Sequence, residues 1–148
     1  MSTATSTSSN LTASVPASNH LASAAELAGR IGLSAIFLFA GLGKIQNYEG
    51  TQGYMASVGV PQELLPLVIL LEVLGALLMI SGLYTRVTAV ALAGFSVVSA
   101  LAFHADLGDQ MQFILFFKNI AMAGGFLVVA AHGAGRWSVD ARRKSGQQ

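Results

Sequence analysis

Four long apolar segments dominate this chain of 148 residues and leave few folds open to it. The segments lie near residues 27–46, 64–83, 87–105 and 111–132. Each approaches the roughly 20 residues that an α-helix needs to cross the hydrocarbon core of a bilayer. Hydrophobic residues make up 53% of the chain and charged residues only 10%, which is more apolar surface than a soluble domain of this size can bury. The sequence therefore predicts an all-α fold, an integral membrane bundle of four helices.

The parts of the chain outside these segments are short. Residues 1–25 are rich in Ser and Thr, and they contain neither Lys nor Arg nor the apolar core of a cleavable signal peptide. We expect them to form a flexible tail. Residues 26–135 are assigned to the transmembrane domain and residues 136–148 to a basic cytoplasmic tail. The longest connection, residues 47–63, contains several Gly residues and Pro61, which argue against a helix continuous with the first span.

The charges between the segments predict the orientation of the bundle. Four basic residues follow the last apolar segment: Arg136, Arg142, Arg143 and Lys144. The connection after the third segment has Asp106 and Asp109 and no basic residue. Because basic residues concentrate on the cytoplasmic side, we expect both termini to be cytoplasmic, with Arg30 and Arg86 on the same side as orientation determinants.

One carboxylate, Glu72, lies in the middle of the second segment. Counted from Leu64 at roughly 1.5 Å per residue, it lies about 12 Å below the outer boundary of the membrane. Lys118 lies at about 10 Å in the fourth segment, beside Asn119. An unpaired charge at this depth is costly, so we expect Glu72 to face the bundle interior and to pair with Lys118.

Further polar and small residues fall on the same helix faces. Lys44 shares a face of the first segment with Arg30 and Gly41, and Glu72 shares a face of the second with Gly75 and Gly82. The Gly residues are expected to let neighbouring helices pack closely. Lys44 and His104 end the first and third segments on the outer side, so the charged and polar residues are predicted to form a pocket in the outer half of the bundle.

Each of these residues also has a purely structural interpretation. A buried ion pair between Glu72 and Lys118 can fix the register of the helices without any ligand. Lys44 at a helix end can be an anchor whose ammonium reaches the interface. His104 near the surface can be a local hydrogen-bond partner.

The sequence resembles the DoxX-like family of small four-helix membrane proteins. The resemblance covers about residues 27–140 and rests on "RIGLSAIFLFAGLGKI", "GVP", "LEVLGALLMISGLYTR", a His at the end of the third helix, and "GAGRWSVD". The positions filled as in the family are Arg30, Gly41, Lys44, Glu72, Gly75, Gly82, Thr85, Arg86, Arg136 and Asp140. The chain departs from the family at Ala76, where a second Gly is common, and in Gly-Ala-Gly, where Gly-Pro-Gly is frequent. We therefore expect a multi-pass protein of the plasma membrane, which is the inner membrane in bacteria.

The resemblance implies a quinol oxidase or quinone-linked oxidoreductase subunit. A quinone needs an apolar slot, donors for its carbonyl oxygens and titratable groups for its protons. Lys44, Lys118 and Asn119 are the predicted ligand-binding donors, and Glu72 and His104 are the predicted catalytic groups that exchange protons. Quinone is the one cofactor that this pocket suggests, and its electrons would have to come from a membrane or soluble redox partner protein. Whether the chain is an enzyme by itself is left open.

The alternative is a non-catalytic membrane subunit or a scaffold that binds a small solute. Such a bundle is also compatible with a homo-oligomer. The chain has no Cys, which excludes iron–sulfur clusters and thiolate zinc sites of its own, and we predict no metal site. A net charge of +1 without a basic, aromatic face excludes nucleic acid as a partner and leaves the lipid bilayer.

Overall fold

The computed structural model describes residues 18–146, and helices account for nearly all of the regular structure in this range. The elements are α1 (Ser18–Gln46), α2 (Tyr48–Ser57), a short 3-10 helix η1 (Gln62–Leu64), α3 (Leu65–Ser81), α4 (Thr85–Phe103), α5 (Gln110–His132) and α6 (Val139–Ser145). Four of them are long and apolar enough to cross a membrane: α1, α3 together with η1, α4 and α5. The structure confirms the predicted all-α membrane bundle.

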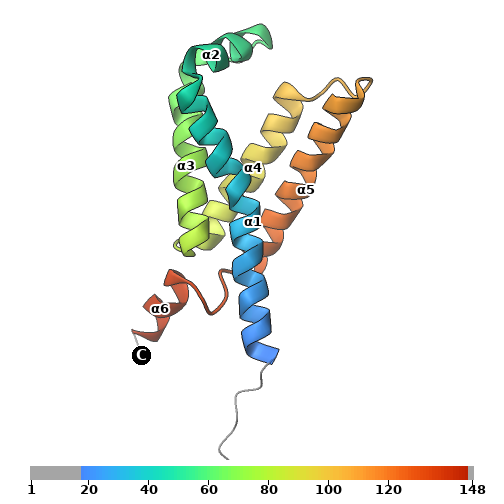
Figure 1. Cartoon of the computed structure of the whole chain (residues 1–148). Coiled ribbons are helices and arrows are strands. Elements are labelled where there is room, and N and C mark those ends of the chain that lie inside the picture. Colours follow the sequence, from blue (N-terminus) through green and yellow to red (C-terminus); the bar gives the residue numbers. More distant parts are fainter. Residues whose placement is uncertain (1–17, 147–148) are drawn as a thin grey trace, which may run out of the picture.

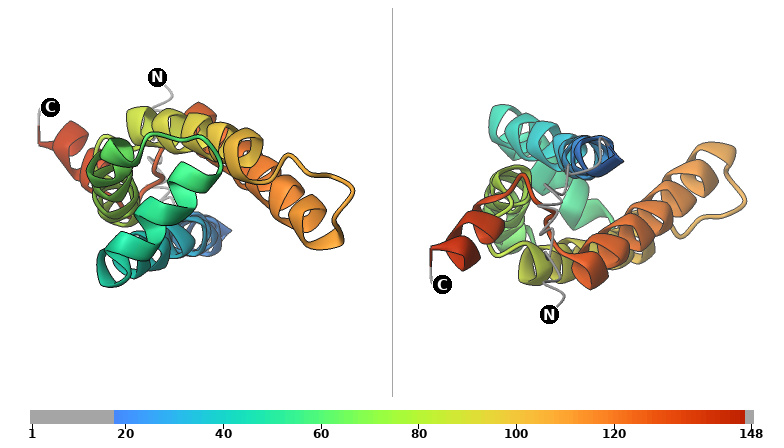
Figure 2. Two further views of the ribbon diagram at one scale, coloured as in Figure 1. Left: turned by 90° about the horizontal axis from the view of Figure 1, so that it is seen from above. Right: turned by 90° about the horizontal axis from the view of Figure 1, so that it is seen from below.

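The four long helices form two antiparallel pairs (Figure 1). Helix α1 packs along α3, and α4 packs along α5. The pairs lie close together near the α3–α4 turn and separate toward α2 (Figure 1). We call these two ends of the bundle the α6 end and the α2 end. Seen from above, α2 lies across the α2 end instead of continuing the line of α1 (Figure 2).

The core of the bundle lies where the two pairs meet. Phe37 of α1 packs edge-on against Phe126 of α5, with ring centroids 5.5 Å apart, and also contacts Phe95 of α4. Small residues such as Ala76, Ala89 and Ala93 complete this core. Their size lets the helices approach closely, which is how membrane helices gain packing energy when lipid is as apolar as the protein.

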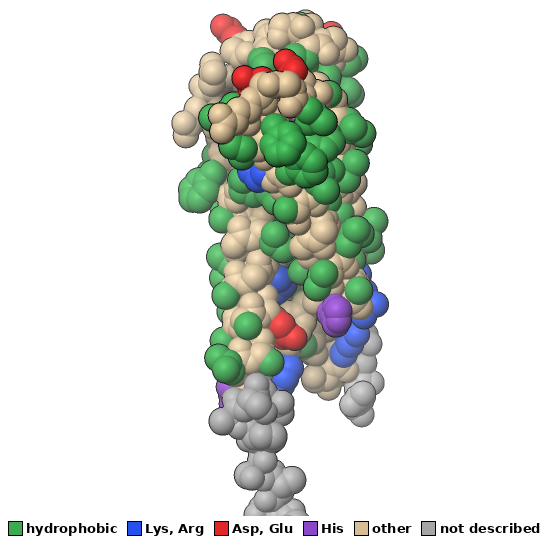
Figure 3. All heavy atoms as spheres, turned by 90° about the vertical axis from the view of Figure 1, so that its right-hand side faces the viewer, with side chains coloured by type: hydrophobic (Ala, Val, Ile, Leu, Met, Phe, Trp, Pro, Cys, Tyr) green, Lys and Arg blue, Asp and Glu red, His purple; other side chains and the backbone are tan. Residues whose placement is uncertain are grey.

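The outer surface of the bundle is apolar. Leu67, Val87, Val98 and Leu101 are among the large hydrophobic side chains that are exposed on the spanning helices. Figure 3 shows a broad belt of hydrophobic side chains between one end with acidic side chains and an opposite end where most of the visible Lys and Arg side chains gather. This distribution suits a protein whose middle is surrounded by lipid.

Two terminal segments are more ordered than the sequence indicated. Helix α1 begins at Ser18, so residues 18–25, which we assigned to the N-terminal tail, belong to the first helix. The rest of that tail, residues 1–17, lies outside the described residues. At the other terminus, the segment after α5 returns to the bundle, where the Asp140 N–H donates to the Gly82 carbonyl over 2.9 Å. Part of the predicted C-terminal tail, residues 137–140, thus contacts the α6 end.

Candidate functional site

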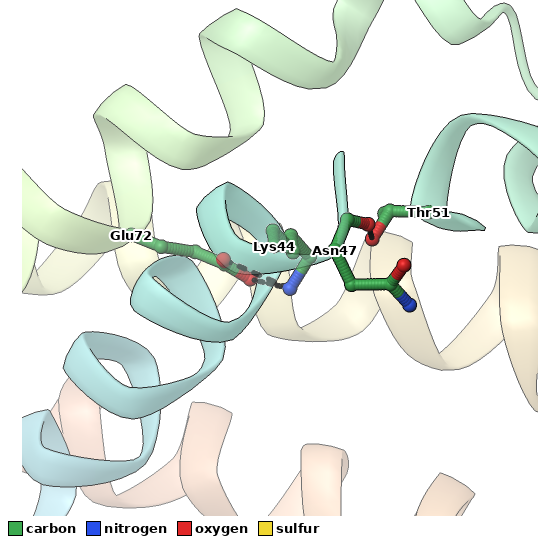
Figure 4. Close-up of polar contacts among 4 residues, drawn as sticks. All are labelled: Lys44, Asn47, Thr51 and Glu72. Carbon is green, nitrogen blue, oxygen red and sulfur yellow. Dashed lines mark hydrogen bonds and ion pairs between the residues drawn. The ribbon is translucent and has the colours of Figure 1, made fainter. Parts of the chain in front are cut away.

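Glu72 is buried and forms an ion pair with Lys44 (Figure 4). The Lys44 ammonium donates to both carboxylate oxygens, with Nζ lying 2.8 Å from Oε1 and 2.9 Å from Oε2. The predicted pairing of Glu72 with Lys118 is therefore wrong. The reason is the pairing of the helices: α3 packs along α1, whereas α5 belongs to the pair that separates from them at this end.

Gly41 brings Lys44 within reach of Glu72. A Cβ atom at position 41 would lie 2.6 Å from Cγ2 of Val73 and 3.2 Å from Cβ of Glu72, so only Gly fits this crossing of α1 and α3 without a shift. Lys44 follows Gly41 by almost one helical turn and so lies on the same face of α1. The close contact thus sets the geometry of the ion pair.

A cavity of about 370 Å³ lies beside this pair at the α2 end. Its walls come from α1, α2, α3, α4 and α5, and most of them are apolar, including Phe37, Phe95 and Phe103. Its charged and polar lining residues include Lys44, Glu72, Ser96, His104, Lys118 and Asn119. The structure therefore brings all five residues that we predicted to be catalytic or ligand-binding to one cavity, although they come from four different helices or helix ends.

The polar side chains that line the cavity differ in whether they have hydrogen-bond or ion-pair partners. The His104 ring contacts the Gln112 side chain, with 2.7 Å between Nδ1 and Oε1. In the neutral tautomer that donates from Nδ1 to this amide oxygen, Nε2 is left as an acceptor. Asn119 has only 8% of its surface exposed, yet its side chain has no hydrogen-bond partner among the described residues. Lys118 is exposed and forms no ion pair within residues 18–146.

Helix α2 covers the cavity. Thr51, Tyr54 and Met55 face it from this side, and the Tyr54 ring stacks on Phe103 of α4 with centroids 5.7 Å apart. The first turn of α2 is held next to Lys44, because the Thr51 N–H and hydroxyl both donate to the Asn47 carbonyl over 3.0 and 2.8 Å (Figure 4). The chain breaks at Asn47 after α1, and the connection that follows contains a second helix, α2, which covers the cavity.

The residues that we predicted to be structural divide between the two ends. Arg30 is almost completely buried at the α6 end, where its guanidinium donates to the Trp137 carbonyl over 2.6 Å and to the Met79 carbonyl over 3.3 Å. Gly82 has φ +69, and a Cβ atom there would collide with Nη1 of Arg30. Gly75 packs against Leu92, and Arg86 is exposed. The sequence did not predict the hydrogen bonds of Arg30 inside the fold. From sequence, a basic residue near the start of an apolar segment is interpreted as an orientation determinant.

Asp140 organises the same end from the C-terminal segment. Its carboxylate accepts hydrogen bonds from the N–H groups of Tyr84 and Thr85, each over 2.9 Å, and so caps the start of α4. Burial opposes the charged form of this carboxylate, but these hydrogen bonds and the nearby Arg143 outweigh it and hold the pKa of Asp140 below its ordinary value. Asp140 is the last residue of the "GAGRWSVD" motif. The sequence shows this motif but does not predict which groups the Asp carboxylate contacts.

No three His, Asp or Glu side chains in residues 18–146 lie close enough together to hold a metal ion. The polar groups that line the cavity include one carboxylate, two ammonium groups, one imidazole, one amide and several hydroxyl groups.

Four apolar helices long enough to span a membrane, with a mostly apolar cavity that contains a few charged and polar side chains, define a small multi-pass membrane protein. The chain belongs to the DoxX family, whose model matches residues 25–105. It is 45% identical over 114 residues to "Inner membrane protein YqjF" of Escherichia coli (strain K12), a match that covers 77% of this chain and 88% of that protein. It is 37% identical over 123 residues to "Inner membrane protein YphA" of the same organism, covering 78% of this chain and 88% of YphA.

No solved structure matches the chain significantly. The two relatives and the four apolar helices support a multi-pass protein of the bacterial inner membrane, embedded in the lipid bilayer.

Proposed function

We propose that this protein is a quinone-linked component of a membrane oxidoreductase and that the cavity at the α2 end binds the quinone ring. The observation that carries the proposal is the convergence of Lys44, Glu72, His104, Lys118 and Asn119 on one apolar cavity. A volume of about 370 Å³ falls within the range of small-molecule sites. The unpartnered Asn119 amide supports a ligand over a merely packed interior.

The cavity residues fit the chemical needs of a quinone. The Phe rings provide an apolar slot, and Lys118 and Asn119 can donate hydrogen bonds to carbonyl oxygens from α5. A bound quinone and its quinol supply the transfer of two electrons and two protons. His104 can accept one of these protons at Nε2, and Glu72 can hold another in exchange for its contact with Lys44. The electrons would be exchanged with a redox partner protein in the membrane or beside it.

The charges at the two ends support an orientation with the cavity in the outer half of the membrane. Asp106 and Asp109 lie in the α4–α5 connection at the α2 end, whereas Arg142, Arg143 and Lys144 lie on α6. By the positive-inside rule both termini are cytoplasmic. His104 and Glu72 then exchange protons with the outer aqueous side.

Extraction of the purified protein tests this proposal. Protein purified in a mild detergent is extracted with organic solvent, and the quinone is counted per protein chain. We expect retained quinone in the wild type and a loss of at least tenfold in Glu72→Gln and Asn119→Leu. Arg142→Gln, on α6 and outside the cavity, is the control and should keep its quinone. A folded wild-type protein that neither retains nor rebinds a quinone overturns the proposal.

A non-catalytic scaffold is the second candidate, and one observation favours it. Lys44 and Glu72 satisfy each other, because both carboxylate oxygens accept from the ammonium. Such a pair can hold α1 against α3 without taking part in chemistry. If Glu72→Gln lowers thermal stability and no ligand is found in the wild type, the scaffold is the better description.

A further inference from the structure

We infer that the cavity selects ligands that carry one anionic oxygen group on an apolar body, and that Lys118 and Asn119 recognise this group. The inference deepens the proposed function, on whose cavity it rests, by naming the charge of the ligand. It follows from the charges that line the cavity, from the depth of Lys118 and from the unpartnered Asn119 amide.

The charges of the cavity do not balance. Lys44 and Glu72 neutralise each other, since the ammonium binds both carboxylate oxygens. His104 is occupied on one side by Gln112. Lys118 remains as a cation without an anion among the described residues. The cavity is therefore positive by one charge.

The acidic residues nearest in sequence to Lys118 are engaged elsewhere. Asp109 caps α5 by accepting from the Gln112 N–H over 2.9 Å. Asp106 accepts from the Gly108 N–H within the α4–α5 connection. The chain thus shows no internal counter-ion for Lys118 within residues 18–146.

Lys118 carries this unbalanced charge within a spanning helix, although its side chain is exposed. It lies about two turns into α5, which begins at Gln110 and is one of the four spanning helices. Charged side chains at such depths pair with an opposite charge or face a polar cavity. Lys118 lines the cavity, so the missing anion has room beside it.

Asn119 is the independent observation that points to a ligand. Only 8% of the surface of this residue is exposed, it lines the cavity, and its side chain has no hydrogen-bond partner in the part of the chain that the structure describes. An amide that faces a mostly apolar cavity without a hydrogen bond is unfavourable. An anionic oxygen beside Lys118 can accept from the Asn119 amide and relieve both defects at once.

The walls and the rim of the cavity define the rest of the ligand. Ile36 and Val98 line the cavity and are also exposed on spanning helices, so the cavity reaches the lipid-facing surface between the two helix pairs. A ligand can therefore enter from the bilayer with an apolar body. The volume of about 370 Å³ suits one ring or a single chain and not the two chains of a phospholipid.

A pair of matched probes tests the inference on the full-length protein in nanodiscs of zwitterionic lipid. The anionic probe is a 2-hydroxy-3-alkyl-1,4-naphthoquinone, whose acidic enol is ionised at neutral pH, and the neutral probe is its 2-methoxy ether. A long-chain carboxylate and its methyl ester form a second pair without a quinone ring. We expect each anion to bind at least tenfold more tightly than its neutral analogue.

Variants assign this preference to residues. Lys118→Met should reduce the preference for the anion to near unity, Lys118→Arg should keep it, and Asn119→Leu should weaken binding of both anions. Lys144→Met, the same change on α6, should have no effect. Removing an unpaired cation from the membrane should not harm folding of Lys118→Met, and a thermal unfolding measurement checks this.

The outcomes separate the inference from the proposed function. Equal binding of the two naphthoquinones overturns the charge selection and leaves quinone binding standing. Preferential binding of the carboxylate without any naphthoquinone binding upholds the charge selection and overturns the quinone. A preference that persists in Lys118→Met also overturns the inference. Loss of probe binding when anionic phospholipid is added would assign the missing anion to a lipid headgroup and overturn a dedicated ligand.

Discussion

The two ends of the bundle differ in what their polar side chains contact. At the α6 end, Arg30 donates to two carbonyls and the Asp140 carboxylate accepts from two N–H groups, so distant segments are tied together. At the α2 end the helix pairs separate, and Lys118 and Asn119 lack partners within residues 18–146. Within residues 18–146, the fully buried side-chain atoms without a hydrogen-bond partner are Arg30 Nε and Thr85 Oγ1, both at the α6 end, but the other hydrogen bonds of these groups and of Asp140 join α1, α3, α4 and the C-terminal segment there. The α6 end thus ties distant segments together, and the α2 end is where we propose that a ligand binds.

The largest expected effect is at the α6 end. Arg30→Met leaves the carbonyls of Met79 and Trp137 without their buried donor, which should lower the free energy of unfolding by about 2–4 kcal/mol. Unfolding in mixed detergent micelles measures the loss, and Arg142→Met on exposed α6 is the control. A loss as small as that of the control would show that the α6 end does not hold the bundle together.

The ion pair at the α2 end should contribute less. In a double-mutant cycle, Lys44→Met and Glu72→Gln should each destabilise the protein, and the double variant should recover part of the loss, with a coupling of about 0.5–3 kcal/mol. The cycle of Glu72→Gln with Lys118→Met should be additive within about 0.5 kcal/mol, since the structure pairs Glu72 with Lys44 instead. Coupling in the second cycle and additivity in the first would reverse this assignment.

Asp140 should give the α6 end a dependence on pH. Its pKa is lowered in the folded protein, so the stabilisation is complete above the unfolded-state pKa of about 4 and is lost as the pH falls through the lower folded-state value. Asp140→Asn should cost about 1 kcal/mol at neutral pH, as for the loss of a helix cap. It should also flatten the acid limb of the stability curve. An unchanged acid limb in this variant would contradict the cap.

The cover over the cavity should contribute least to stability. Tyr54→Leu removes the stacking on Phe103, which is worth about 0.5–1.5 kcal/mol beyond the buried area. We expect a small loss of stability and a several-fold faster release of any probe bound in the cavity, measured by stopped-flow displacement. Leu21→Ala, on an exposed part of α1, serves as the comparison. Unchanged release would mean that ligands leave only between the helix pairs.

Much of the candidate site follows from local sequence. A carboxylate in an apolar run must turn away from lipid whatever its partner, so the inward position of Glu72 could be predicted without knowing the fold. Depth along a helix depends only on counting residues, which is why Lys44, His104, Lys118 and Asn119 were expected near Glu72 and line the same cavity.

The sequence by itself determined the class of fold, because lipid accepts only segments whose backbone groups are satisfied internally, and four apolar stretches of sufficient length leave helices as the solution. Only the tertiary structure decided which helices pair. Lys44 and Lys118 are both within the plausible depth of Glu72, and the choice between them depends on the close crossing of α1 and α3 at Gly41. The contact of Asp140 with the α3–α4 turn also depends on the tertiary structure. It joins residues that are far apart in the chain, and a local sequence pattern cannot predict such a contact.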